Sequence, residues 1–280
     1  MVRRKPTMRA VWLGRALRGL REGARLTVRQ FGDRIGKDGS TVSRVESGEQ
    51  PVSIEVLDGY LEHCAVDDPQ RRSDLLTIRS DVALDGWWDA YRKDISPSLM
   101  DRVWLESKAT RINSFETMVL PGLLQLPEYS EALMRRKHPD APDGEIKRWA
   151  EVRMQRQHIV SRHDPVQLNC IVDASVLRRS CGDIDIMKKQ LDYLIEVNDH
   201  PNVSLRVLPS HECTGIEGSF ELFQLTEPYP EVGYVATPAG DICLEETKLD
   251  RLRRAYTEVE RSSHPPAESR DVIAAERDRL

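Results

Sequence analysis

Residues 26–66, LTVRQFGDRIGKDGSTVSRVESGEQPVSIEVLDGYLEHCAV, decide the fold because helix-starting and helix-ending residues alternate along them. Thr27, followed three residues later by Gln30, has the pattern of a capping box, and Gly36 is typical of the position after a helix. The same signals predict two further helices: residues 39–47, capped by Asp38 and ended by Gly48, and a helix that begins at Ser53. The stretch therefore predicts three short helices joined by tight turns.

Periodic apolar residues predict one more helix on each side of this stretch. On the N-terminal side, Leu13 and Leu17 share the apolar face of a helix over residues 11–22. On the C-terminal side, a fifth helix is predicted over residues 70–82. We therefore expect an all-α, five-helix domain over residues 1–82.

The helix over residues 39–47 has two different faces. Val42 and Val45 point to the core of the domain. The other face and the N-terminal end are small and polar apart from one arginine: Gly39, Ser40, Thr41, Ser43, Arg44 and Ser47. Small residues permit close approach to the major groove of DNA, where an arginine can bind guanine O6 and N7 together. An ordinary solvent-facing helix has similar residues, so the pattern alone leaves both interpretations open.

Charge is unevenly divided along the 280 residues, whose net charge is −5. Residues 1–50 contain 12 Lys and Arg against 5 Asp and Glu, whereas the rest of the chain contains 29 against 41. This asymmetry is expected when only the first domain meets phosphates. The alternative is a solvated basic arm formed by Arg3, Arg4 and Lys5.

The segment over residues 26–66 resembles the Cro/repressor (Xre) helix-turn-helix family. The matching landmarks are Leu26-Thr27, Gly36, Ser43-Arg44, Glu46 and Gly48. The resemblance implies that three residues face base edges: Gly39, Ser40 and Arg44. It implies that three others hold phosphates: Thr27, Thr41 and Ser47. It also implies that Arg21 and Glu46 pair as a structural bridge between the first and third helices.

Two positions depart from this family. Gly39 has no side chain with which to contact a base, and Gly32 stands where the family usually has Ala. Base readout is therefore expected to depend on Ser40 and Arg44. Because one short helix contacts few base pairs, we expect a homodimer on double-stranded DNA, with half-sites about 10 base pairs, or a multiple of that, apart.

Residues 83–262 have a different pattern, in which helical and strand periods alternate. Helices are predicted near residues 98–113, 127–137, 145–161, 184–199 and 247–261. Strands are predicted near residues 114–119, 166–172, 203–208, 219–226 and 232–237. This order indicates a mixed α+β domain that receives a signal or a partner. Residues 263–280 are rich in proline and charge, and we expect a charged tail with a short exposed helix or no fixed structure.

The second half contains characteristic strings in order: Trp104-Leu105-Glu106, residues 120–125 (LPGLLQ), Tyr129, Arg153, Arg156-Gln157, residues 176–179 (VLRR), Gln190-Leu191 and residues 203–209. In these strings the chain is similar to the actinobacterial WhiJ-like transcriptional regulators, in which an Xre domain comes first. The resemblance implies a regulator that is often encoded beside a small acidic partner protein, which binds the C-terminal domain and alters DNA binding. The chain departs from the family in Asp173-Ala174-Ser175 and at Ala236, where the family tends to have Glu.

The LPGLLQ string has two interpretations. Pro121 and Gly122 predict a turn after an apolar strand, and the favoured interpretation is a structural turn packed on the core. The alternative is the edge of a partner or ligand groove, in which Gln125 offers amide contacts and Trp88 and Trp104 line the walls.

Catalytic and nucleotide-binding motifs are absent: the sequence has no GxSxG, P-loop, HExxH or glycine-rich nucleotide fingerprint. The five cysteines are scattered and odd in number, which favours reduced thiols over disulfides: Cys64, Cys170, Cys181, Cys213 and Cys243. His211, Cys213 and Cys243 lack metal-ligand spacing, so neither a metal nor a cofactor is expected. No apolar run approaches the roughly 18 residues of a membrane span.

The favoured function is therefore a cytoplasmic, sequence-specific DNA-binding transcriptional regulator whose second domain is gated by a small partner protein or a ligand, and not an enzyme. One alternative keeps the DNA-binding domain but makes the protein an antitoxin-like autoregulator or a protein-interaction scaffold. A third, less favoured, gives the second domain hydrolytic or transfer chemistry.

Overall fold

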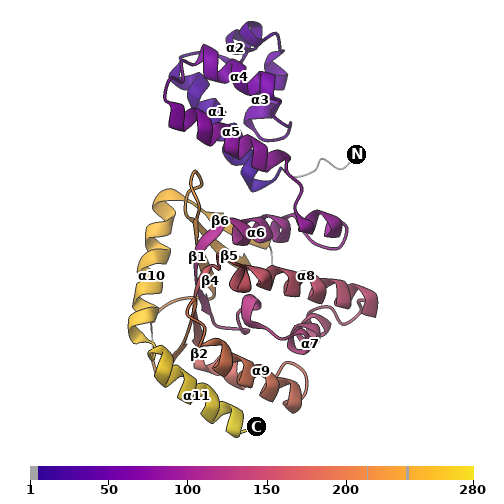
Figure 1. Ribbon diagram of the computed structural model, residues 1–280, viewed down its shortest axis with the longest axis vertical. Coiled ribbons are helices and arrows are strands. Elements are labelled where there is room, and N and C mark those ends of the chain that lie inside the picture. The colour runs from indigo at the N-terminus through magenta and orange to yellow at the C-terminus, as the bar shows by residue number, and fades with distance from the viewer. Residues whose placement is uncertain (1–5, 213, 238–239) are drawn as a thin grey trace. The chain divides into compact units, whose positions relative to one another are not determined.

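The computed structural model describes residues 6–212, 214–237 and 240–280 (Figure 1). The chain divides into an N-terminal unit, which runs to Ala90 and includes Leu99–Asp101, and a C-terminal unit made of Tyr91–Ser98 and Arg102–Leu280. The division falls after Ala90 rather than after residue 82. Arg3, Arg4, Lys5 and Cys213 lie outside the described residues.

Five α-helices form the N-terminal unit up to residue 83, as predicted: α1 (Met8–Gly23), α2 (Val28–Ile35), α3 (Gly39–Glu46), α4 (Ile54–His63) and α5 (Pro69–Ala83). Each begins at a side chain that accepts a hydrogen bond from a backbone N–H of the first turn: Thr7, Thr27, Asp38, Ser53 and Asp68. A cap of this kind typically contributes about 1 kcal/mol. The helix α1 begins earlier than predicted because Thr7 caps it.

The core of this unit is small and closely packed. Leu13, Leu17, Phe31, Leu57 and Tyr60 are fully buried. Burial of each such side chain contributes about 1.5–3 kcal/mol. Together, the five side chains therefore contribute more to the stability of the unit than the five helix caps do. The apolar faces of the short helices therefore hold the unit together.

A six-stranded mixed sheet with the strand order β3-β2-β1-β4-β5-β6 forms the centre of the C-terminal unit. The strands are β1 (Ala109–Glu116), β2 (Gln167–Asp173), β3 (Val203–Leu208), β4 (Phe220–Leu225), β5 (Val232–Thr237) and β6 (Gly240–Leu244). The α-helices are α6 (Pro97–Lys108), α7 (Pro127–Lys137), α8 (Asp143–Ser161), α9 (Ile184–Val197), α10 (Leu249–Ser262) and α11 (Pro266–Asp278). Short 3₁₀ helices are η1 (Trp87–Tyr91), η2 (Gly122–Leu124), η3 (Ala174–Arg178) and η4 (Glu246–Lys248).

The connections explain the strand directions. The strands β1, β2 and β3 are parallel because helices connect them, whereas β4, β5 and β6 follow one another closely and pair antiparallel. Figure 1 shows α10 on one face of the sheet and α8 and α9 on the other.

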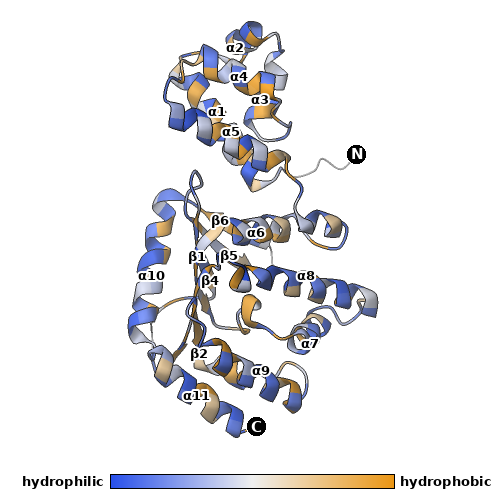
Figure 2. Ribbon diagram, in the orientation of Figure 1, coloured by the Kyte–Doolittle hydropathy of each residue, from blue (hydrophilic) through white to orange (hydrophobic). Residues whose placement is uncertain are grey.

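The two faces of the sheet differ in polarity. Hydrophobic residues gather along the strands (Figure 2), and under α10 they include Phe115, Phe220 and Leu222. Because neighbouring residues of a strand point to opposite faces, Glu116 and Glu221 face the side away from α10. Two carboxyl groups are therefore placed on the sheet face that α8 covers.

Three elements differ from expectation. The predicted helix over residues 98–113 ends at Lys108, and β1 follows it. A bulge between Ala109 and Arg111 in the pairing of β1 with β4 leaves buried residues of this strand three apart. That spacing is the one expected of a helix, so the sequence predicted a longer helix. The strand β6 was not predicted because most of its residues are exposed, so its apolar pattern is weak.

The expected charged tail over residues 263–280 is instead part of the C-terminal unit, because α11 has a buried face. Ile273 and Ser269 are fully buried, and the hydroxyl of Ser269 accepts a hydrogen bond from the N–H of Val207 in β3 (2.9 Å). Glu276 forms an ion pair with Arg178 (2.7 Å). Within the described parts of the chain, no helix combines the length and the apolar character needed to cross a bilayer.

Candidate nucleic-acid interface

The helix α3 presents a polar face to solvent. Val42 and Val45 are 2% and 1% exposed and hold the helix to the core. The predicted contact residues Ser40, Arg44 and Ser47 are exposed, and Gly39 and Thr41 are half-buried. All the predicted residues of α3 therefore lie away from the core or at its margin.

The first turn of α3 is ordered by Asp38. Its Oδ1 accepts hydrogen bonds from the N–H of Thr41 (2.6 Å) and from the hydroxyl of Ser40 (2.7 Å). The bond from Ser40, followed by the N–H of Thr41, lowers the pKa of Asp38. Ser40 thus donates to its own cap, and its lone pairs stay free to accept from a base amino group.

Arg44 is the long donor of this face. One of its Nη2 hydrogens is donated to the hydroxyl of Thr41 (3.2 Å), which uses one of the five N–H groups of the guanidinium. Ser47 donates its hydroxyl to the carbonyl of Arg44 (3.1 Å). The bond to Thr41 orients the exposed arginine along the helix and leaves other N–H groups of the guanidinium for guanine recognition.

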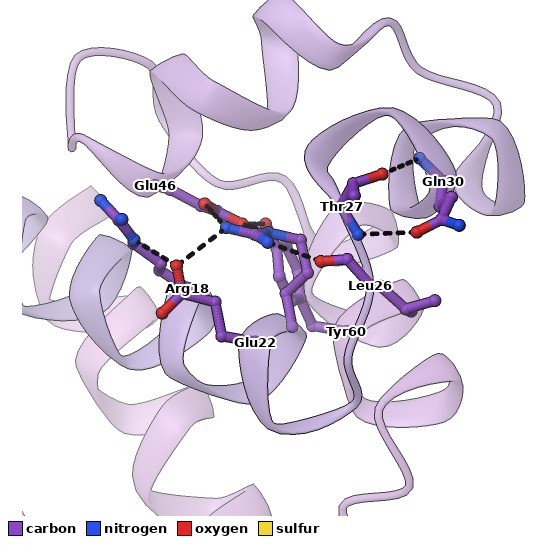
Figure 3. Close-up of polar contacts among 8 residues, drawn as sticks. Arg18, Glu22, Leu26, Thr27, Gln30, Glu46 and Tyr60 are labelled. Carbon is purple, nitrogen blue, oxygen red and sulfur yellow. Dashed lines mark hydrogen bonds and ion pairs between the residues drawn. The ribbon is translucent and has the colours of Figure 1, made fainter.

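The helix α2 begins beside the start of α3. Thr27 and Gln30 form the predicted capping box: the N–H of Gln30 donates to the Thr27 hydroxyl (3.2 Å), and the N–H of Thr27 donates to Oε1 of Gln30 (2.9 Å) (Figure 3). Thr27 is exposed, and its hydroxyl proton remains available to a phosphate.

Arg29 was missed by the sequence interpretation. A Cβ added to Gly39 would lie 3.6 Å from the backbone nitrogen of Arg29, so the backbones of the two helices meet at this point. The Arg29 side chain is exposed. The excess of basic residues before residue 50 indicated that this part of the chain contains phosphate-contacting residues, but charge alone does not distinguish Arg29 from the other arginines.

A buried ion pair fixes α3 against α1, as predicted. Nε and Nη2 of Arg21 donate to the two carboxylate oxygens of Glu46 at 2.6 and 2.8 Å, and Nη1 of Arg21 donates to the carbonyl of Leu26 (2.6 Å). The hydrogen bond with Glu46 raises the pKa of Arg21. Tyr60, which the sequence interpretation did not include, donates its hydroxyl to Glu46 (2.8 Å) (Figure 3). Three helices therefore converge on one carboxylate.

The three residues proposed for a second-domain groove come from both units of the chain. Trp88 is buried in the N-terminal unit against Trp87, with ring centroids 5.9 Å apart. Trp104 is buried in the C-terminal unit and packs edge-on against Tyr229 (4.8 Å). Gln125 lines a cavity within the C-terminal unit.

Gln125 also explains the LPGLLQ string. Its amide nitrogen donates to the carbonyl of Leu120 (2.7 Å), and Gln157 donates to the carbonyl of Gln125 (2.6 Å). The string is therefore a buried turn, as the favoured interpretation stated, and one side of it faces a cavity.

Comparison with known families agrees with this division of the chain. A model of a helix-turn-helix domain matches residues 12–73, and a model of a domain of unknown function (DUF5753) matches residues 99–275. No curated protein and no solved structure matches the chain. Since the second match covers more than half of the 280 residues, the chain belongs to the DUF5753 family, here preceded by a helix-turn-helix domain.

Proposed function

We propose that this protein is a sequence-specific DNA-binding transcriptional regulator in which α3 enters the major groove. The observation that carries the proposal is the exposed face of α3, small and polar around Arg44, on a helix held by two buried valines and the Arg21–Glu46 pair. In this arrangement Arg44 binds guanine, Ser40 accepts from a base, and the bare backbone of Gly39 allows close approach.

Phosphate contacts surround this helix in the proposal. Thr27, Thr41 and Ser47 supply hydroxyl groups, and Arg29 adds a charge at the start of α2. The expected form is a homodimer on a pseudo-palindromic operator, because one eight-residue helix contacts few base pairs.

The finer assignment follows the family resemblances. The N-terminal unit is proposed to be of the Xre type, and the whole chain to be a cytoplasmic WhiJ-like regulator. Its C-terminal unit would act without catalysis and receive a small acidic partner protein or a ligand. An antitoxin-like autoregulator uses the same DNA interface and differs in its operator, which would then lie before its own gene.

The test begins with genome-wide capture of DNA fragments at a stated, near-physiological salt concentration, since low salt inflates non-specific binding. Gel-shift titration of the recovered site then compares variants. Arg44→Ala is expected to weaken specific binding by about 1–3 kcal/mol. The matched control is Arg71→Ala, which removes one exposed arginine from α5 of the same unit. Recovery of no site, or equal affinities for the two variants, would contradict the proposal.

A further inference from the structure

A cavity of about 130 Å³ lies inside the C-terminal unit, on the sheet face away from α10. Its walls come from α6, β1, the LPGLLQ turn, α8, β4 and β5. Cavities of about 150 Å³ hold a benzene-sized molecule, so this one has room for a small ligand or for one end of a larger one.

Two of the three arginines at this cavity are neutralised by carboxylates. Arg156 forms a bidentate pair with Glu106, with Nε and Nη2 at 2.8 and 2.7 Å from the carboxylate oxygens. Arg102 bonds to Glu221 (2.7 Å) and to Glu106 (3.3 Å). These four side chains form a closed ionic network in which each charge has an opposite partner.

Arg153 stands outside this network. Its Nη1 donates to Oε1 of Gln125, which is a neutral amide, and its buried Nε has no hydrogen-bond partner. Among the described residues, no carboxylate lies within ion-pair distance of Arg153. Burial lowers the pKa of Arg153 to about 9, with Arg156 and Arg102 acting in the same direction. Arg153 is half-buried, and a partly desolvated cation without a counter-charge is costly, so a bound anion would reduce that cost.

Glu116 faces the same cavity but does not neutralise Arg153. Burial and the neighbouring Glu221 raise the pKa of Glu116 to about 8, against the opposing effects of Arg102, Ser219 and Arg153. Tyr234, also in the cavity wall, has a pKa raised by burial and is a neutral phenol. At neutral pH Glu116 therefore carries a proton and can donate a hydrogen bond.

The charges do not balance with the cavity empty. Arg102 and Arg156 are ion-paired with Glu221 and Glu106, and the pairing with Arg102 opposes the rise that burial causes in the pKa of Glu221. Glu116 is protonated at neutral pH, which leaves one positive charge at Arg153. Leu120, Phe220 and Ala236 supply an apolar part of the wall.

We propose that this cavity binds a small organic anion, whose carboxylate or phosphate group contacts Arg153 and Glu116 and whose apolar part packs against Leu120 and Ala236. The inference concerns the C-terminal unit alone and stands whether or not α3 binds DNA. It gives DUF5753 in this chain a ligand site of stated chemistry.

Isothermal titration calorimetry of the full chain at neutral pH tests the ligand class. The probes are benzoate, inorganic phosphate and, at the same ionic strength, benzylammonium. One of the two anions is expected to bind saturably with a dissociation constant of about 1 mM or tighter, and which one binds identifies the group that the site takes. Saturable binding of benzylammonium, or of none of the three, overturns the proposal.

Two variants locate the binding. Arg153→Gln removes the unpaired cation and is expected to weaken anion binding at least tenfold, whereas Arg136→Gln, on the exposed surface of α7, leaves it unchanged. Circular dichroism checks that both variants are folded. Undiminished binding by folded Arg153→Gln overturns the site.

The other informative variant is Glu116→Gln, which keeps Arg153 in place. In the native protein, ionisation of Glu116 repels the ligand, so affinity falls as the pH rises through about 8. Glu116→Gln keeps a neutral donor and is expected to bind with native affinity at pH 7 and to keep that affinity through pH 8, below the pKa of about 9 at which Arg153 loses its charge. A parallel decline in both proteins contradicts the role of Glu116.

Discussion

At the scale of single residues, Gly14 decides how closely α1 and α3 pack. A Cβ at this position would lie 2.4 Å from the carbonyl oxygen of Glu46, a backbone atom that cannot move alone. Gly14→Ala is therefore expected to force the two helices apart and to destabilise the N-terminal unit by about 1–3 kcal/mol.

Gly19 provides the matched control, because it lies in the same helix with open space around its Cα. Gly19→Ala is expected to stabilise the unit by up to about 1 kcal/mol through helix propensity. Amide hydrogen exchange in α1 and α3 measures both changes. Stabilisation of similar size by the two alanines would show that helix propensity, and not packing, governs position 14.

Glu46 has a comparable role among the polar residues. Glu46→Gln removes the charged partner of both short bonds of the buried Arg21 guanidinium, leaves only the longer contact with Glu22 (3.5 Å), and weakens the bond from Tyr60. We expect a loss of roughly 3 kcal/mol of local stability, as for other buried pairs that lose one partner. Glu22→Gln removes the exposed partner of Arg18 and only the longer contact with Arg21, so it should cost much less. Hydrogen exchange in α3 measures the stability lost in each of the two variants. Similar losses would mean that the Arg21–Glu46 pair contributes no more than a solvent-exposed ion pair.

At the scale of elements, local signals were sufficient for α2 and α3, which carry their own caps. Thr27 with Gln30 and Asp38 with Thr41 are contacts three residues apart, so the sequence displays both partners together. The burial of Ser269 in α11 depends instead on a bond to Val207, 62 residues away, and the charged composition of α11 concealed its buried face. Predictability thus followed the sequence separation of the stabilising contacts.

The helices α2 and α3 are expected to divide the work of DNA binding. Arg29 in α2 lies beside the first turn of α3 and is assigned to a phosphate, whereas Arg44 is assigned to a base. Arg29→Ala should therefore weaken binding about equally on specific and unrelated DNA, and should reduce the slope of log affinity against log salt by about 0.9. Arg44→Ala should mainly reduce the preference for the specific site. Salt titrations on both DNAs measure this, and a change of sequence preference in Arg29→Ala would contradict the assignment.

At the scale of the whole molecule, the cavity in the C-terminal unit could not be inferred from sequence order. Its charged residues come from positions 102, 116, 153, 156 and 221, which lie on α6, β1, α8 and β4. Each of these elements was predicted separately, but nothing local indicates that Glu116 and Arg153 share one cavity. Gln125 was proposed for a ligand groove because of its turn, and the fold places it beside Arg153, which the sequence interpretation did not pair with it.

The same cavity makes the stability of the C-terminal unit depend on pH. Glu116 has a pKa of about 8 in the folded protein, against an ordinary value of 4.5. Between these values the folded state holds a proton that the unfolded chain has released, so this group causes stability to fall as the pH rises, by up to about 1.4 kcal/mol per pH unit, and to level off above 8. Glu116→Gln should remove this decline, whereas Glu128→Gln, exposed on α7, should retain it. Urea unfolding from pH 5 to about pH 9, read from circular dichroism, gives the slopes. Identical slopes in all three proteins would mean that Glu116 is ionised in the fold, and the positive charge left at Arg153 would then have its counter-charge within the chain.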